Sequence, residues 1–172
     1  AEVEGIERIR YMTSYPADMD EELISAHGEV PALMPFLHLP VQSGSDKILK
    51  AMNRRHGSDQ YRQLVERLVK ARSDIALSSD FIVGFPGEKD SDFDSTMKLV
   101  KEIGFIQAYS FKYSPRPGTP ANDLPDSVPL ETKKHRLQEI IALQHKQSEQ
   151  LGQSFIGKNI EAVSISKVII LS

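Results

Sequence analysis

The sequence predicts an α/β protein whose parallel sheet forms either part of a βα barrel or a small open sheet. Four apolar, β-prone runs begin near residues 7, 36, 75 and 107, and helical patterns separate them. This alternation is typical of repeated βαβ units. Polar loops rich in glycine, proline and serine accompany the runs, and such sheets collect functional loops at the carboxyl ends of their strands. The 172 residues fall short of the roughly 250 that a closed eight-stranded barrel needs.

The first part of the chain is expected to contain two strands and two short helices. Residues 7–12 (ERIRYM) alternate like a strand, and Asp18 precedes the amphipathic pattern MDEELISAHG, whose acidic first turn suits the helix dipole. The second strand is expected at 35–41, interrupted by Pro40. Ser45 is then a suitable N-cap for the helical segment DKILKAMNR.

The middle of the chain predicts two longer helices around a third strand. Ser58 is expected to cap the first of them, whose apolar residues recur at the spacing of one helical face. The third strand follows at 75–83. Asp90 or Ser91 opens the next helix, and Gly104 is expected to end it, as a C-terminal glycine commonly does.

The last part of the chain predicts one more strand, a long helix and the start of another domain. The fourth strand is expected at 107–113, and all four strands should be adjacent in chain order because parallel crossovers are right-handed. A proline-rich loop leads to a helix from about 131 to 151. The tail 159–172 alternates like the first strand of a β domain. We therefore divide the chain into residues 1–151 and residues 152–172.

The composition narrows the function classes. Hydrophobic residues make up 40% and charged residues 26%, which is ordinary for a globular protein, and the net charge of −3 argues against a polybasic surface over the whole chain. No apolar run approaches the roughly 18 residues that span a bilayer. The absence of cysteine excludes disulfides, thiolate metal ligands and a cysteine nucleophile. We expect a cytoplasmic protein without membrane contact.

The loop HLPVQSGS offers backbone N–H groups near Gly44 and a helix N-terminus, which would suit a carboxylate, phosphate or ribose. A plain strand–turn–helix joint explains the same residues. His38 lies within an apolar run and is interpreted as a core histidine, because no second histidine or cysteine has the spacing of a metal ligand.

Two further loops carry candidate binding residues. In SDFIVGFPGE, Gly84 and Gly87 flank Phe85-Pro86 and would let the backbone approach a flat ligand, although a tight turn explains them equally well. Glu88 could anchor this loop. In YSPRPGTPA, Arg116 stands between two prolines that fix the backbone, so its partner is either a bound carboxylate or phosphate or a structural salt bridge.

The segments HLPVQSGSDKILKAMNRRH, SSDFIVGFPGEKDSDF and YSPRPGTPA, in this order and spacing, resemble the radical SAM methylthiotransferases. The resemblance extends over about residues 5 to 160. The stretch AYSFKYSPRPGTPAND favours the members that add a methylthio group to an isopentenylated adenosine of tRNA, next to the anticodon. The resemblance implies a partial, six-unit βα barrel of the radical SAM type, of which about four units are present. A small β-barrel, the TRAM domain, would follow, with only its first strand in this chain.

The resemblance also implies that S-adenosylmethionine binds at the carboxyl ends of the strands. Gln42 and Ser43 would line the ribose and methionine part of the cofactor. Gly84 would back the adenine, and Asp80 stands where the family motif has its first glycine. The remaining implied contacts are Phe111 and Tyr113 beside the adenine and Arg116 towards the substrate.

One departure from the family concerns its two 4Fe-4S clusters. The family holds a catalytic cluster with the motif C-x-x-x-C-x-x-C and an auxiliary cluster with three cysteines, and this sequence has no cysteine. We therefore expect a fragment that holds no metal ligand and no catalytic residue and is inactive alone. The expected partners are a tRNA substrate, an electron donor for the cluster, and further copies of the chain at an exposed edge strand at 7–12.

Two other interpretations stay open. The chain could belong to a methylthiotransferase that acts on another modified adenosine or on a ribosomal protein. It could also be a non-catalytic parallel α/β binding domain that shares the pattern. Cysteines of the family motif in the same protein would support an enzyme, and their absence would support the binding domain.

Overall fold

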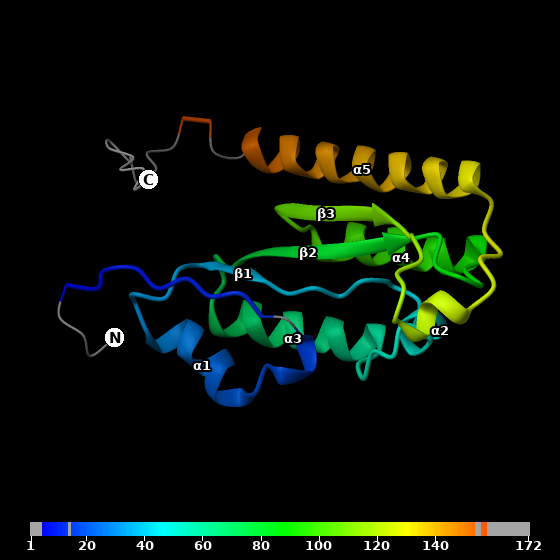
Figure 1. Cartoon of the computed structure of the whole chain (residues 1–172). Coiled ribbons are helices and arrows are strands. Elements are labelled where there is room, and N and C mark those ends of the chain that lie inside the picture. The colour runs from blue at the N-terminus through cyan, green and yellow to red at the C-terminus, as the bar shows by residue number, and fades with distance from the viewer. Residues whose placement is uncertain (1–4, 14, 154–155, 158–172) are drawn as a thin grey trace, which may run out of the picture.

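The computed structural model describes residues 5–13, 15–153 and 156–157. Three parallel strands form one sheet in the order β1-β2-β3, which confirms the α/β fold with a parallel sheet (Figure 1). The elements in chain order are η1 (Pro16–Asp18), α1 (Glu21–Glu29), β1 (Phe36–His38), α2 (Asp46–Ala51), α3 (Ser58–Ala71), β2 (Ala76–Val83), α4 (Asp90–Ile103), β3 (Gln107–Lys112), η2 (Pro120–Asp123) and α5 (Leu130–Gln153).

The predicted first strand at 7–12 is not a strand. The segment runs parallel to β1 and to the chain that leads into it, but with the described residues it makes only two isolated bridges, Ile9 with Leu33 and Met12 with His38. Its parallel neighbour is the one predicted, but the sheet has three strands in chain order and not the four expected. The ladder is short because little of the segment is buried: Met12 remains 69% exposed.

The predicted second strand is shortened by Pro40, which has no N–H to donate. Regular strand pairing stops at His38, and single hydrogen bonds to β2 hold the residues that follow. Leu39 N–H donates to Ser78 O (2.8 Å), and Val41 N–H donates to Ser79 Oγ (3.0 Å). The chain from 39 to 42 therefore stays alongside β2 and carries the end of the strand towards the site.

The starts of the helices differ in detail from those expected. Asp20, and not Asp18, caps α1, because its side chain accepts a hydrogen bond from Leu23 N–H (2.8 Å). Asp18 lies in the preceding 3-10 turn. Ser58 is the first residue of α3 rather than its cap, and Asp46 Oδ1 accepts its N–H (2.6 Å).

Three other helix boundaries are as predicted. Ser45 caps α2 by accepting from Ile48 N–H (3.4 Å). Helix α4 begins at Asp90 and ends at Gly104, whose φ of 68° is the left-handed conformation that glycine adopts readily. Helix α5 extends to Gln153. The predicted strand at 159–172 lies outside the described residues.

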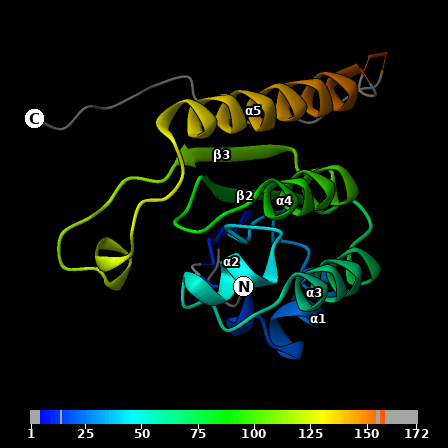
Figure 2. The same ribbon diagram turned by 90° about the vertical axis from the view of Figure 1, so that its right-hand side faces the viewer.

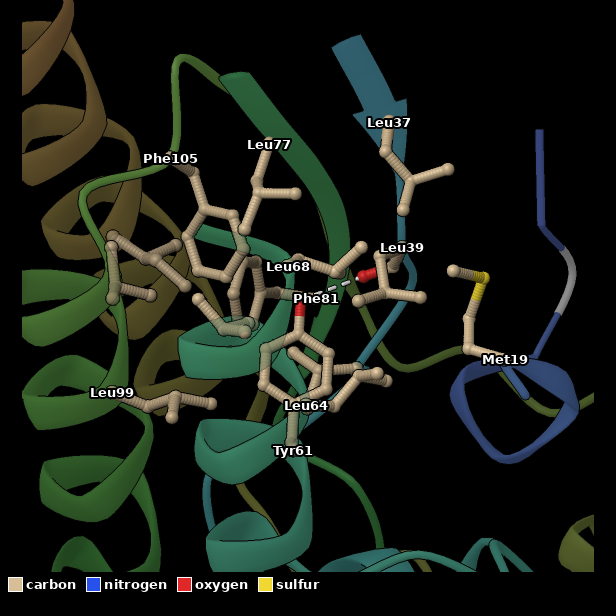
Figure 3. Close-up of a cluster of buried hydrophobic side chains, with 14 of the residues drawn as sticks. Met19, Leu37, Leu39, Tyr61, Leu64, Leu68, Leu77, Phe81, Leu99 and Phe105 are labelled. Carbon is tan, nitrogen blue, oxygen red and sulfur yellow. Dashed lines mark hydrogen bonds between the residues drawn. The ribbon is translucent and has the colours of Figure 1, made fainter. Parts of the chain in front are cut away.

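Helices α3 and α4 pack on one face of the sheet, α5 lies along β3, and the loop that contains η2 lies on the other side (Figure 2). The core between the sheet and α3 and α4 is apolar and contains Leu39, Tyr61, Leu68, Phe81, Leu99 and Phe105 (Figure 3). Leu77, Ser79 and Phe81 of β2 face this core. Because side chains alternate along a strand, Ser78 and Asp80 between them face the opposite side. That side carries the site. No helix in the part of the chain that the structure describes is long and apolar enough to cross a membrane.

Replacing Tyr61 with phenylalanine should lower the free energy of unfolding by about 1 kcal/mol. The Tyr61 hydroxyl is buried and donates to Leu39 O (2.9 Å), as Figure 3 shows. The loss should be small because Ser79 Oγ also donates to Leu39 O (3.0 Å) and would keep this carbonyl satisfied. Urea denaturation of the Tyr61→Phe variant measures the change, with Tyr109→Phe, on an exposed ring, as the control. A loss above about 3 kcal/mol would contradict this account.

Candidate functional site

A pocket of about 790 Å³ opens at the carboxyl ends of the three strands. Its volume is within the usual range for small-molecule sites, roughly 300–1,000 Å³. Five of the seven residues predicted from the sequence line it, from the end of β1, from β2, from β3 and from the loop after β3: Gln42, Asp80, Phe111, Tyr113 and Arg116. The fold therefore brings together residues that are up to 74 positions apart in the chain (116 − 42).

Gln42 is fixed at the floor of this pocket by backbone hydrogen bonds. Its N–H donates to Asp80 O (2.9 Å), and its carbonyl accepts from Ile82 N–H (3.0 Å). Its φ of 77° lies in the left-handed region, which non-glycine residues rarely adopt. These two bonds to β2 hold the unusual conformation, so Gln42 and Asp80 stay next to each other at the strand ends.

The apolar part of the pocket lining includes three aromatic rings, those of Phe85, Phe111 and Tyr113. Phe85 packs edge-on against Tyr113, with 5.0 Å between the ring centroids. The Tyr113 hydroxyl donates to Ala121 O (2.7 Å), which ties the loop after β3 to the strand, and burial together with Asp126 raises the pKa of Tyr113. Phe111 is 55% exposed, so its ring is accessible to a ligand.

Ser43 does not line the pocket. It is fully buried, with its Oγ 3.3 Å from Thr96 Oγ1 and accepting from Ser45 N–H (3.2 Å). Gly44 N–H donates to Thr96 Oγ1 (2.9 Å). The N–H groups of Gly44 and Ser45 therefore already have partners, in α4 and within the loop, and the loop HLPVQSGS is a strand–turn–helix joint packed against α4.

Gly84 also lies behind the pocket and not in its lining. Its φ is 70°, and a Cβ at this position would come within 2.3 Å of Lys133 Cγ on α5, so the residue allows the loop and the helix to approach closely. Its N–H donates to Glu88 Oε2 (2.7 Å), and this buried carboxylate also pairs with Arg136 Nη1 (2.7 Å). Glu88 thus anchors the loop, as one interpretation of the sequence proposed.

The charged lining of the pocket is mostly positive, with Arg54, Lys112 and Arg116 against one acid, Asp80. Arg116 has no ion pair among the described residues, and its carbonyl accepts from Thr119 N–H and Oγ1 (3.2 and 2.8 Å), which fixes the turn. Such a lining suits a ligand with a carboxylate or a phosphate.

Some lining residues were not identified as site residues from the sequence. Arg54 follows α2, where a basic cluster is usually solvated, and yet it reaches the pocket with its guanidinium over the Tyr15 ring (5.6 Å). Phe85 and Pro86 were visible as a strand-end motif, but the packing of Phe85 on Tyr113 depends on two separate loops. Residues 119–121 enter because the loop after β3 folds back over the strand ends.

The first 100 residues match the family model of the Radical SAM superfamily. The chain belongs to the radical SAM superfamily. Members of this superfamily are enzymes, and the family implies S-adenosylmethionine and a 4Fe-4S cluster as cofactors. The pocket at the strand ends is where the parallel fold of a radical SAM protein is expected to place its chemistry.

A solved radical SAM structure resembles this chain. It is coproporphyrinogen III oxidase (HemN) from Escherichia coli, described as a radical SAM enzyme, with a TM-score of 0.61 and 22% sequence identity. The match covers 77% of this chain and 31% of the HemN chain. At this identity the likeness shows the fold, and the chain spans less than a third of the length of its structural relative.

The two radical SAM cofactors differ in how well they fit the residues present. The aromatic wall and the neighbouring Gln42 and Asp80 are the surfaces that a nucleoside such as that of S-adenosylmethionine requires, an apolar slot with a few fixed polar groups. The cluster does not fit this chain, because its irons are held by thiolates and the 172 residues contain no cysteine. We therefore derive no electron-transfer step from these residues.

Proposed function

We propose that this chain is part of a tRNA-modifying radical SAM methylthiotransferase, most similar to tRNA-2-methylthio-N6-dimethylallyladenosine synthase. The observation that carries the proposal is the gathering of Gln42, Asp80, Phe111, Tyr113 and Arg116 around one pocket. These residues come from three separate motifs whose order and spacing resemble that family. Because strand ends meet in any parallel sheet, the support comes from the residue types gathered there: two aromatic rings, an amide, a carboxylate and a guanidinium, as a nucleoside and an RNA phosphate require.

In this proposal the pocket binds the nucleoside part of S-adenosylmethionine, which supplies the radical chemistry when it is bound. The rings of Phe111 and Tyr113 give the adenine an apolar surface, and Asp80 accepts hydrogen bonds from the cofactor. Gln42, which two backbone hydrogen bonds hold against β2, supplies a polar group beside Asp80. Arg116 serves the substrate side, where its cation would meet a phosphate of the RNA.

The partners of the whole protein follow from the same proposal. A tRNA would be the substrate, a TRAM domain would follow α5, and an electron donor would serve a cluster whose cysteines another part of the protein supplies. We place this protein in the cytoplasm. The segment 7–12 makes only two isolated bridges to other described residues, so we also propose that the isolated chain self-associates along it. Light scattering that shows a monodisperse monomer would refute this.

The direct test uses the whole protein that contains this chain, with reconstituted iron and sulfide. It is incubated with S-adenosylmethionine and tRNA that carries isopentenyladenosine, and the digested nucleosides are analysed by mass spectrometry. Methylthio-isopentenyladenosine is the expected product. Modification of a ribosomal protein instead, or an unchanged tRNA alongside an active cofactor cleavage, would show that another substrate is used.

We expect the 172-residue chain alone to bind S-adenosylmethionine weakly and to have no methylthiotransferase activity. No thiolate is present to hold the iron that would bind the methionine part, and ligands gain their full affinity only when they are nearly enclosed. Titration calorimetry of the purified chain tests this expectation. Micromolar affinity without added iron would show that the remaining loops already form a complete site.

A further inference from the structure

A row of three polar side chains crosses the open face of the sheet: Ser78 and Asp80 on β2, and His38 at the end of β1. His38 pairs in register with Ser78, and Asp80 lies two residues further along β2, so the three side chains share one face. Asp80 borders the main pocket and also a second hollow of about 380 Å³, which His38 lines together with Thr13 and Arg54.

His38 is held at more than one point. Its Nδ1 lies 2.8 Å from Ser78 Oγ. Its carbonyl accepts from Thr13 N–H (3.2 Å) and Thr13 Oγ1 (2.7 Å), and its ring meets Tyr109 edge-on at 6.1 Å between centroids. The residue is 6% exposed. A buried imidazole requires a polar neighbour at each ring nitrogen, and the second neighbour of His38 is a side chain that lines the pocket.

The other ring nitrogen faces Asp80. His38 Nε2 lies 3.6 Å from Asp80 Oδ1, and the Asp80 side chain keeps 29% of its surface exposed. If the Ser78 hydroxyl donates to Nδ1, the ring proton is on Nε2 and is directed to the carboxylate. At 3.6 Å the contact is slightly longer than a hydrogen bond, and it places Oδ1 of the carboxylate against the ring while the other oxygen remains for a ligand in the pocket.

We infer that His38 is a positioning residue that orients the Asp80 carboxylate to accept hydrogen bonds from the vicinal hydroxyls of a bound ribose. A carboxylate at a strand end is a common acceptor for ribose hydroxyls in parallel α/β proteins. Ser78 acts indirectly, because its hydrogen bond fixes the tautomer and the orientation of the His38 ring. The inference rests on the proposed nucleoside pocket, which Asp80 lines.

The test is an NMR titration of the chain with adenosine and with 2′,3′-dideoxyadenosine, which lacks both hydroxyls. The measured quantity is the ratio of the two dissociation constants, because a change in general pocket shape would affect both ligands alike. We expect the wild type to prefer adenosine about tenfold, the factor that one hydrogen bond to a charged group supplies. His38→Phe should reduce the preference to about twofold or less, and Ser78→Ala should reduce it partly.

Two further variants keep the result interpretable. His38→Gln retains a donor near the position of Nε2 and should keep most of the preference, so it also serves if His38→Phe does not fold. His135→Phe, on the exposed side of α5, should change nothing. An unchanged tenfold preference in both His38→Phe and Ser78→Ala overturns the inference while the nucleoside pocket stands. Equal binding of the two nucleosides by the wild type also overturns the inference and leaves the nucleoside pocket standing. A wild type that binds neither nucleoside refutes the nucleoside pocket, and the inference with it.

Discussion

Replacing Arg136 with methionine is expected to lower the free energy of unfolding by about 3–5 kcal/mol at neutral pH. The guanidinium is 6% exposed and donates from Nη1 to Glu88 Oε2 (2.7 Å) and from Nη2 to Asp90 Oδ1 (2.6 Å). The Glu88 side chain is 1% exposed, and its Oε1 has no hydrogen-bond partner. Without Arg136, this buried carboxylate would keep only the Gly84 N–H as a partner.

The loss of unfolding free energy caused by Arg136→Met should depend on pH, and the protonation of Glu88 determines whether the loss grows or shrinks with pH. Burial raises the pKa of Glu88 above its usual value, although the Gly84 N–H and Arg136 oppose the change. A carboxyl group with a raised pKa in the folded state stabilises the protein fully below its unfolded pKa, and this contribution is lost as the pH rises through the folded pKa. Removing Arg136 raises the folded pKa further, so the variant should lose less stability near pH 4 than at pH 7.

Urea denaturation at the two pH values measures both effects. The matched control is Lys134→Met, two residues before Arg136 on the same helix, because Lys134 pairs with Glu131 at the surface (2.8 Å) and exposed pairs contribute little. A loss below about 1 kcal/mol for Arg136→Met, or a loss that grows on acidification, would show that Arg136 does not neutralise Glu88.

Replacing Gly44 with alanine is expected to lower the free energy of unfolding by about 3 kcal/mol. A Cβ at this position would lie 2.4 Å from Ser95 O and 2.6 Å from Thr96 Cα. Both are backbone atoms of α4, so the clash cannot be relieved by turning a side chain. The helix or the turn must move, and the hydrogen bond from Gly44 N–H to Thr96 Oγ1 (2.9 Å) would be weakened as well.

Gly152→Ala is the control for this prediction. Gly152 lies in the last turn of α5, and a Cβ there meets no atom within 4 Å. Alanine is the better helix former, so this change should raise stability by up to about 1 kcal/mol. Thermal and urea denaturation of the two variants should therefore move in opposite directions. Similar stability of Gly44→Ala and the wild type would mean that the contact with α4 is looser than the structure shows.

The sequence was sufficient to predict those structural features that depend only on nearby residues. Alternating or helical periodicity placed β1 to β3 and the long helices, because burial of one face requires that spacing. Ser45 and Gly104 were identified as helix boundaries because a side-chain cap and a left-handed φ each involve only nearby backbone. The order of the parallel strands followed from the handedness of the crossovers.

Neighbours from elsewhere in the chain decided the rest. Ser43 and Gly44 look like binding residues in the sequence, but α4 packs on them and takes up their hydrogen bonds. At Gly84, Lys133 of α5 packs closely, and the N–H donates to Glu88. The segment 7–12 has the pattern of a strand, but too little of it is buried for a full ladder. In the same way, the approach of His38 to Asp80 depends on the register between β1 and β2. Periodicity reports which face of an element is apolar, whereas contacts between elements are set by packing, which one segment of sequence does not contain.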